Sequence, residues 1–125
     1  MILDTNGLAA LAEGEPALEP VLRGASQLAI PVIVLGEYRC GISQYRNRQQ
    51  YEQWLKEHLQ EFRILDIEDR TTLSYSAVRS ELKKAGTPIP SNDVWIAALC
   101  RQHSLPLVSR DRHFDLVTGI NRISW

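Results

Sequence analysis

The chain has 125 residues, of which 44% are hydrophobic and 23% are charged, and this length and composition predict one domain, over residues 1–125, with its own buried core. The net charge of −1 excludes the basic excess that is typical of many nucleic-acid-binding domains. No run approaches the roughly 20 apolar residues of a membrane span, and the first residues lack the regions of a signal peptide. We therefore expect a cytoplasmic protein.

The two cysteines, Cys40 and Cys100, stand far apart and have no other cysteine or histidine at ligand spacing. This spacing indicates neither a zinc site nor a disulfide framework, and we expect both cysteines to be small buried side chains. If four of the 15 acidic residues bound a metal, the rest of the chain would have 11 acidic residues and 14 lysines and arginines. A surplus of three positive charges on the rest of the surface would suit a polyanion.

Short apolar runs alternate with helix-length segments along the whole chain, a pattern that predicts a parallel sheet covered by helices. In chain order, the predicted elements are a strand at 1–3, helices at 5–13 and 16–23, a strand at 28–33, helices at 35–45 and 48–61, a strand at 63–67, a helix at 69–85, a helix with the apolar body 94–100, and strands at 105–108 and 121–124. The simplest architecture is a single three-layer α/β/α sandwich with a mostly parallel central sheet.

Two of these helices carry end signals. Gly86 follows the helix at 69–85 and suits a C-cap, and Ser91 or Asn92 can cap the next helix. The body of that helix, 94–100, is apolar on nearly all sides. We therefore expect it to be buried centrally.

Two aspartates follow predicted strands, where ligands bind in open parallel sheets. Asp4 closes the first strand, and Asp111 comes shortly after the strand at 105–108, with the hydroxyl of Ser109 nearby. Each has an ordinary alternative, since Asp4 could simply cap the first helix and Asp111 could belong to a polar turn. Asp115 is a possible substitute for Asp111.

Two further acids stand near the starts of predicted helices. Asp93 opens the apolar helix, where the helix dipole alone would favour an acid. Glu37 lies between Gly36 and Gly41, which allow close approach of a backbone or ligand, although it could also pair with Arg39. Four acids in four separate segments can all converge on one edge of a sandwich of this topology.

A cluster of four carboxylates requires a cation. Two carboxylates about 4 Å apart repel each other by roughly 4 kcal/mol at an effective dielectric constant of 20. Ligation by oxygen alone indicates Mg²⁺ or Mn²⁺ rather than zinc. Such a site suits phosphodiester hydrolysis, in which the metal activates a water and stabilises charge on the attacking and leaving oxygens.

Four segments together resemble the signatures of PIN domains of the VapC type. They are Asp4-Thr5-Asn6, Gly36-Glu37-Tyr38-Arg39-Cys40-Gly41, residues 88–98 around Asp93, and residues 107–114 around Asp111. The resemblance covers almost the whole chain, and its departures are small. Gly7 follows the first motif where an aliphatic residue is more usual, and Ser109 stands where threonine is common.

The resemblance implies a Mg²⁺- or Mn²⁺-dependent endoribonuclease that acts as the toxin of a toxin–antitoxin pair on structured RNA such as tRNA or rRNA. It implies Asp4, Glu37, Asp93 and Asp111 as catalytic and metal-binding residues, supported by Thr5, Asn6 and Ser109. It also implies a homodimer, with a cognate antitoxin that inserts into the acidic groove and can build a higher assembly. The family pattern places no catalytic histidine at His113, to which we assign a structural role.

Several side chains outside the acidic set have expected roles. Arg110 and Arg112 flank Asp111 and are candidates to bind RNA phosphates. Trp95 is expected in the core. Three aromatic residues of the long helical pair, Tyr45, Tyr51 and Trp54, are expected to form a dimer or antitoxin surface.

Three other functions are compatible with parts of the pattern. A catalytically idle PIN-like module that binds RNA or protein would have lost one or more of the acids, and all four are present. A phosphatase of the haloacid dehalogenase type would need a second aspartate where Asn6 stands. A DNA nuclease of the flap-endonuclease group would need extensions for which this chain is too short.

Overall fold

The computed structural model describes all of residues 1–125 and contains one sheet of five parallel strands. The strands are β1 (Ile2–Leu3), β2 (Leu28–Pro31), β3 (Phe62–Leu65), β4 (Leu107–Val108) and β5 (Arg122–Ile123). Their order across the sheet is β3-β2-β1-β4-β5. The chain thus winds outward from β1 to one edge and then returns to the other side of β1, so its direction of winding changes between β1 and β4.

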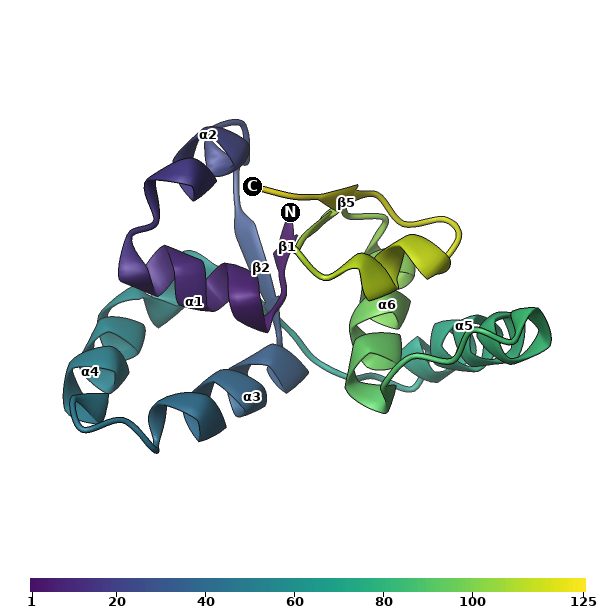
Figure 1. Cartoon of the computed structure of the whole chain (residues 1–125), viewed down its shortest axis with the longest axis horizontal. Helices are drawn as coiled ribbons and strands as arrows, with labels where there is room; N and C mark the ends of the chain where they lie inside the picture. Colours follow the sequence, from purple (N-terminus) through teal and green to yellow (C-terminus); the bar gives the residue numbers. More distant parts are fainter.

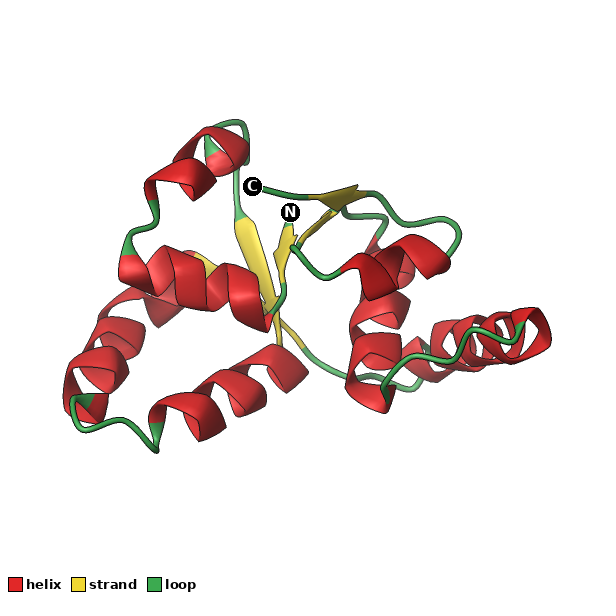
Figure 2. Cartoon of the chain, in the orientation of Figure 1, coloured by secondary structure: helices red, strands yellow, loops and turns green.

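The helices cover both faces of this sheet. They are α1 (Thr5–Glu13), α2 (Glu19–Leu22), α3 (Val32–Ile42), α4 (Arg48–His58), α5 (Thr71–Ala85) and α6 (Ser91–His103), with short 3₁₀ turns at Pro16–Leu18, Leu59–Glu61 and Arg112–Leu116. Figure 1 shows α1, α3 and α4 on one side of the strands and α5 and α6 on the other. Figure 2 shows the same arrangement as a helical, a strand and a second helical layer. The predicted α/β/α sandwich is confirmed.

The largest difference from the predicted elements lies between β2 and α3. The predicted strand at 28–33 ends at Pro31, and α3 begins at Val32 rather than Leu35. Val32, Ile33 and Val34 have the β-branched side chains typical of strands. They enter a helix because Pro31 is the N-cap, with an extended backbone of φ −59° and ψ 142°, and because Val34 is buried in the core.

Two predictions about α6 have different outcomes. Its body is buried from Ile96 to Cys100, as the apolar sequence predicts. The predicted cap at Ser91 or Asn92 is wrong, because the extended Pro90 is the N-cap and no side chain caps the helix. Ser91 is already in the first turn, and its hydroxyl accepts a hydrogen bond from Arg79 at 3.1 Å.

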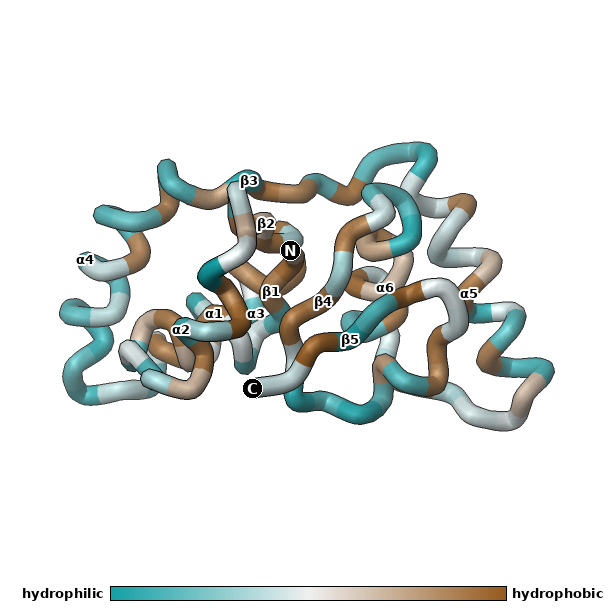
Figure 3. The backbone as a smooth tube through the Cα atoms, turned by 90° about the horizontal axis from the view of Figure 1, so that it is seen from above, coloured by the Kyte–Doolittle hydropathy of each residue, from teal (hydrophilic) through white to brown (hydrophobic).

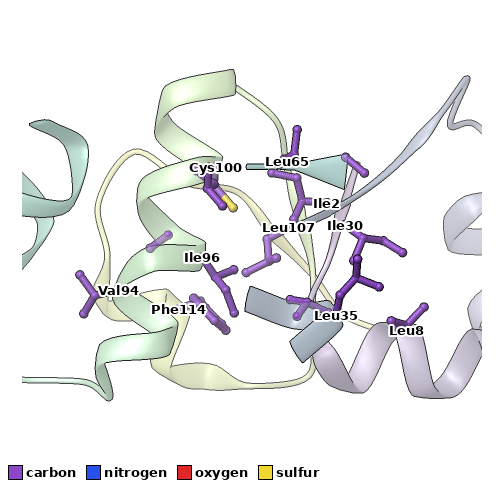
Figure 4. Packing of buried hydrophobic residues seen from close by; sticks show 14 of the residues in the cluster. Ile2, Leu8, Ile30, Leu35, Leu65, Val94, Ile96, Cys100, Leu107 and Phe114 are labelled. Carbon is purple, nitrogen blue, oxygen red and sulfur yellow. The ribbon is translucent and has the colours of Figure 1, made fainter. Parts of the chain in front are cut away.

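The core forms where α6, the strands and α3 meet. Figure 4 shows Ile96 and Phe114 beside Leu107 and Ile2, and all four are buried in one cluster. In Figure 3 the apolar residues follow the strands and the inner helices, whereas α4 is mostly hydrophilic. Cys100 is buried as expected, but Cys40 is exposed, so that prediction is wrong for Cys40, which lies on the outer face of α3.

The predicted C-terminal end of the helix at 69–85 is confirmed, whereas the predicted strands at 105–108 and 121–124 are shorter in the structure, at Leu107–Val108 and Arg122–Ile123. α5 ends at Ala85, and Gly86 adopts the left-handed conformation with φ 71°, which glycine accepts without steric cost. None of the six helices has both the length and the apolar character that crossing a membrane requires.

A candidate acidic metal centre

The carboxyl ends of β1 and β4 lie side by side, because these strands pair in parallel with Leu3 opposite Val108. The helices α1, α3 and α6 all begin at this end of the sheet (Figure 1). Asp4 follows β1 and Ser109 follows β4. The sheet therefore brings together residues that are more than 100 positions apart in the sequence.

Asp4 is both a helix cap and a member of the site. Its carboxylate is buried, Oδ1 accepts the backbone N–H of Gly7 at 2.7 Å, and Oδ2 accepts the hydroxyl of Ser109. Burial raises the pKa of Asp4, while the bonds from Ser109 and Gly7 oppose this effect and the charges of Asp111 and Glu37 add to it. The cap holds the carboxylate at the tip of β1 and does not exclude a role as a ligand.

Gly7 explains one departure from the family pattern. A Cβ atom at this position would lie 3.1 Å from the carbonyl oxygen of Val108 and 3.3 Å from Oδ1 of Asp4. Both distances are tighter than ordinary van der Waals contact. The glycine therefore lets α1 pack closely against β4 and against the carboxylate that caps it.

Ser109 connects two of the predicted acids. It is fully buried, its hydroxyl donates to Asp4, and the same oxygen accepts the backbone N–H of Asp111 at 2.9 Å. Asp111 in turn caps the 3₁₀ turn that follows, since its Oδ1 accepts the backbone N–H of His113 at 2.9 Å. The hydroxyl thus fixes the positions of Asp4 and Asp111, the first and last of the four predicted acids, relative to each other.

Asp93 lies across from Asp111, and His113 lies between them. The Nδ1 atom of His113 is 3.5 Å from Oδ2 of Asp93 and 3.3 Å from Oδ1 of Asp111. One ligand atom from each of these three side chains lies within 4.8 Å of the others. Burial and the charge of Asp111 raise the pKa of Asp93, and the hydrogen bond to His113 opposes this.

Glu37 approaches from α3. Its Oε1 accepts the hydroxyl of Thr5 at 3.1 Å, and it makes no ion pair with Arg39. Its charge, like that of Asp111, raises the pKa of both Asp4 and Asp93. These mutual effects place all four acids within one electrostatic neighbourhood.

The remaining predicted residues divide into those at the site and those held elsewhere. Asp115 lies outside the cluster, because it pairs with Arg122 at 2.8 Å and this partner lowers the pKa of Asp115. Arg110 pairs with Glu15, and its guanidinium lies 4.6 Å from the ring centroid of Trp125. Arg112 is exposed and has no ion pair. Asn6 is also exposed, beside Thr5 at the start of α1.

His113 is the side chain of this site that sequence reasoning assigned elsewhere. The sequence contained one signal for this role of His113, which is its position two residues after Asp111. A side chain two positions after a capping aspartate can contact the carboxylate of that aspartate. Trp95, which we expected in the core, is only half-buried, and its ring is stacked on that of Tyr75 with centroids 3.9 Å apart.

The donor chemistry fits a hard divalent cation. The cluster offers carboxylate oxygens from four segments, and the one basic side chain in contact with them is His113. Burial raises the pKa values of Asp4 and Asp93, and the charges of Asp111 and Glu37 raise them further. Mg²⁺ and Mn²⁺ favour such oxygen ligands.

A parallel sheet between two helical layers, with acids at its carboxyl edge, is an α/β/α fold of the nuclease type, and the family model of the PIN domain matches residues 1–120. The chain belongs to the PIN domain family.

Known members of this family are similar over most of the chain. Ribonuclease VapC5 of Mycobacterium tuberculosis is 26% identical over 120 residues, which cover 94% of this chain and 87% of the relative. Ribonuclease VapC2 of Rickettsia felis is 28% identical over 99 residues, covering 78% and 74%. The crystal structure of VapBC2 from Rickettsia felis, bound to a DNA fragment from its promoter, superposes with a TM-score of 0.86 at 26% identity and covers 99% of this chain and 97% of that chain.

Proposed function

We propose that this protein is a divalent-metal-dependent endoribonuclease and the toxin of a toxin–antitoxin pair. The observation that carries the proposal is the buried Ser109 hydroxyl, which joins Asp4 to Asp111 at the edge where Asp93 and Glu37 also lie. The names of the relatives, which are ribonucleases, support RNA as the substrate. Structured RNA such as tRNA or rRNA is the proposed class.

The roles of the residues follow from their positions. Asp4, Asp93, Asp111 and Glu37 would hold Mg²⁺ or Mn²⁺, which when bound would orient the phosphate and stabilise the charge that develops on its oxygens. Oε1 of Glu37 is occupied by Thr5, which leaves its second oxygen to orient a water at the phosphate.

Two groups outside the acids complete the proposed site. Arg112, which is exposed and unpaired, is the proposed contact to a neighbouring phosphate. Arg110 is a weaker candidate, because its guanidinium already pairs with Glu15 and covers Trp125. Asn6 is proposed as a further polar group at the mouth of the site.

A protein partner is part of the proposal. A toxin–antitoxin complex from Klebsiella pneumoniae superposes with a TM-score of 0.74 at 26% identity and covers 95% of this chain and 93% of that chain. This likeness supports a cognate antitoxin for the present chain. A homodimer or a higher assembly with the antitoxin is also part of the proposal, and Leu73 on α5, which is 74% exposed, is a candidate contact of that assembly.

The test is cleavage of total bacterial RNA by the purified protein with Mg²⁺, with Mn²⁺ and with EDTA. Asp93→Asn should abolish cleavage, whereas Asp115→Asn should retain it, because Asp115 lies outside the cluster and pairs with Arg122. Discrete fragments that need both the metal and Asp93 would establish the ribonuclease. Equal cleavage by wild type and Asp93→Asn would identify a contaminating nuclease, and no cleavage by a folded, partner-free protein would favour the idle binding module.

A further inference from the structure

A cavity of about 190 Å³ borders the acidic site between α1 and α3. One face of α1 supplies Thr5, Ala9 and Glu13, and one face of α3 supplies Glu37 and Gly41. Residues four apart lie on the same side of a helix, so the cavity runs along both helices. It begins at Glu37 and Thr5, beside the acidic cluster, and ends at Glu13, about two helical turns away.

Three tyrosines, Tyr38, Tyr45 and Tyr51, line the cavity together with Glu13. Oε1 of Glu13 accepts the hydroxyl of Tyr51 at 2.6 Å, and the ring of Tyr51 meets that of Tyr45 edge-on, with centroids 5.5 Å apart. Tyr45 is half exposed, whereas Tyr38 is only 4% exposed. These rings offer stacking surfaces next to a carboxylate.

The hydroxyl of Tyr38 is buried and has no hydrogen-bond partner. A tyrosine hydroxyl carries its proton at neutral pH, so this group can donate a hydrogen bond. Buried polar groups are nearly always paired in folded proteins. An unpaired O–H beside a cavity therefore points to a ligand that supplies an acceptor.

The charges of the cavity limit what this ligand can be. Its lining includes two carboxylates and no lysine or arginine, which excludes a phosphate group. The occupant must offer N–H donors to Glu13 and an acceptor to Tyr38. Arginine and lysine side chains carry donors only, whereas the edge of a nucleobase carries both kinds of group.

We propose that the cavity between α1 and α3 binds one unpaired base of the RNA substrate, with guanine as the best fit. Guanine alone among the bases offers two adjacent donors, N1–H and N2–H, which suit a carboxylate such as Glu13, beside the O6 acceptor for Tyr38, and the tyrosine rings suit base stacking. The volume is below the roughly 300–1,000 Å³ of sites for drug-sized ligands, and so suits a single base. The assignment rests on the proposed ribonuclease function, because it places the attached phosphate at the acidic cluster.

Two glycines of α3 provide a matched pair of variants. A Cβ atom added at Gly36 or at Gly41 would meet no neighbouring atom within 4 Å, and leucine is a better helix former than glycine. Only Gly41 lines the cavity. Gly41→Leu should therefore fill the cavity, Gly36→Leu should leave it open, and both should fold as stably as the wild type by thermal melting.

Binding is measured without any RNA cleavage, by saturation-transfer NMR with guanosine, adenosine, uridine and argininamide as probes. Guanosine should bind wild type and Gly36→Leu, and its signal should disappear in Gly41→Leu. Tyr38→Phe removes one neutral hydrogen bond and should weaken guanosine binding by about fivefold. Equal guanosine signals in the two glycine variants, or no nucleoside signal at all, would overturn the proposal.

The four probes distinguish a base site from a site for a basic side chain of a protein partner, and they test the base site separately from the proposed nuclease function. Binding of argininamide without any nucleoside would overturn the base site and assign the cavity to a basic side chain of a protein partner. If the protein cleaves RNA, wild type and Gly36→Leu should prefer guanine at one fixed position relative to the cut, and Gly41→Leu should cleave without that preference. Guanosine binding by a protein that cleaves no RNA would refute the nuclease and leave the base site in place.

Discussion

Replacing Ser109 with alanine should destabilise the metal-free protein by about 2–4 kcal/mol. The hydroxyl is fully buried, donates to Oδ2 of Asp4 and accepts the backbone N–H of Asp111 at 2.9 Å. A hydrogen bond to a charged group contributes about 1.5–3 kcal/mol, and an unpaired buried donor costs about 1–3 kcal/mol more. Asp111 is only half-buried, so water can reach its N–H once the Ser109 hydroxyl is removed. The expected loss of stability is therefore smaller than the sum of the upper values of these two ranges.

The assay is urea unfolding in EDTA at pH 7, followed by circular dichroism. Ser80→Ala is the control, because it removes the same hydroxyl from an exposed position on α5 and should change the free energy of unfolding by less than about 0.5 kcal/mol. For a domain of this length, the expected loss in Ser109→Ala corresponds to a melting temperature lower by about 10 °C. A value within about 0.5 kcal/mol of wild type would refute the claim that this hydroxyl holds the two acids together.

Three other perturbations test separate parts of the site. Burial and the charge of Asp111 raise the pKa of Asp93, so the folded metal-free protein binds more protons than the unfolded chain and loses stability as the pH rises from about 4 through the raised pKa. Asp93→Asn should therefore have a higher melting temperature than wild type at pH 7 in EDTA, and millimolar Mn²⁺ should raise the melting temperature of wild type alone. A lower melting temperature for Asp93→Asn in EDTA would contradict the charge argument. Arg112→Gln should weaken RNA binding and reduce the slope of log K against log salt by about 0.7 in anisotropy titrations, while Arg110→Gln should chiefly loosen the C-terminal segment; equal effects on RNA binding would show that Arg110 also contacts phosphate. Leu73→Glu should shift the sedimentation profile from dimer toward monomer, and an unchanged profile would place the dimer surface elsewhere.

The sheet and its acids could be predicted because their signals are local. An apolar run that ends in Asp4, or in Ser109 and Asp111, predicts the carboxyl end of a parallel strand from a few consecutive residues. This prediction does not depend on contacts with distant segments. The helix start at Val32 could not be predicted in this way. Its β-branched sequence favours a strand, and the helix forms because Pro31 sets the turn and Val34 packs into the core.

The parts of the site that escaped prediction depend on contacts between distant segments. The unpaired hydroxyl of Tyr38 arises from the packing of α3 against α1 and α4, and α3 by itself gives no sign of it. His113 reaches Asp93 only because the 3₁₀ turn after β4 lies next to the start of α6. The exposure of Cys40 similarly depends on which face of α3 the other helices cover.

The sequence offered two interpretations of Asp4, as a helix cap or as a metal ligand; the structure shows the cap, and this role is compatible with the second one, which remains a proposal. The backbone of Asp4 is extended, with φ −81° and ψ −177°, as a capping residue requires, and this conformation holds the carboxylate at the tip of β1. Asp111 is fixed in the same way, as the cap of the 3₁₀ turn that contains His113. Because capping has already ordered both side chains, a cation would bind without the entropy cost of immobilising them. The acids instead repel one another in the metal-free protein, and this repulsion lowers the stability of the fold. A bound cation would remove the repulsion.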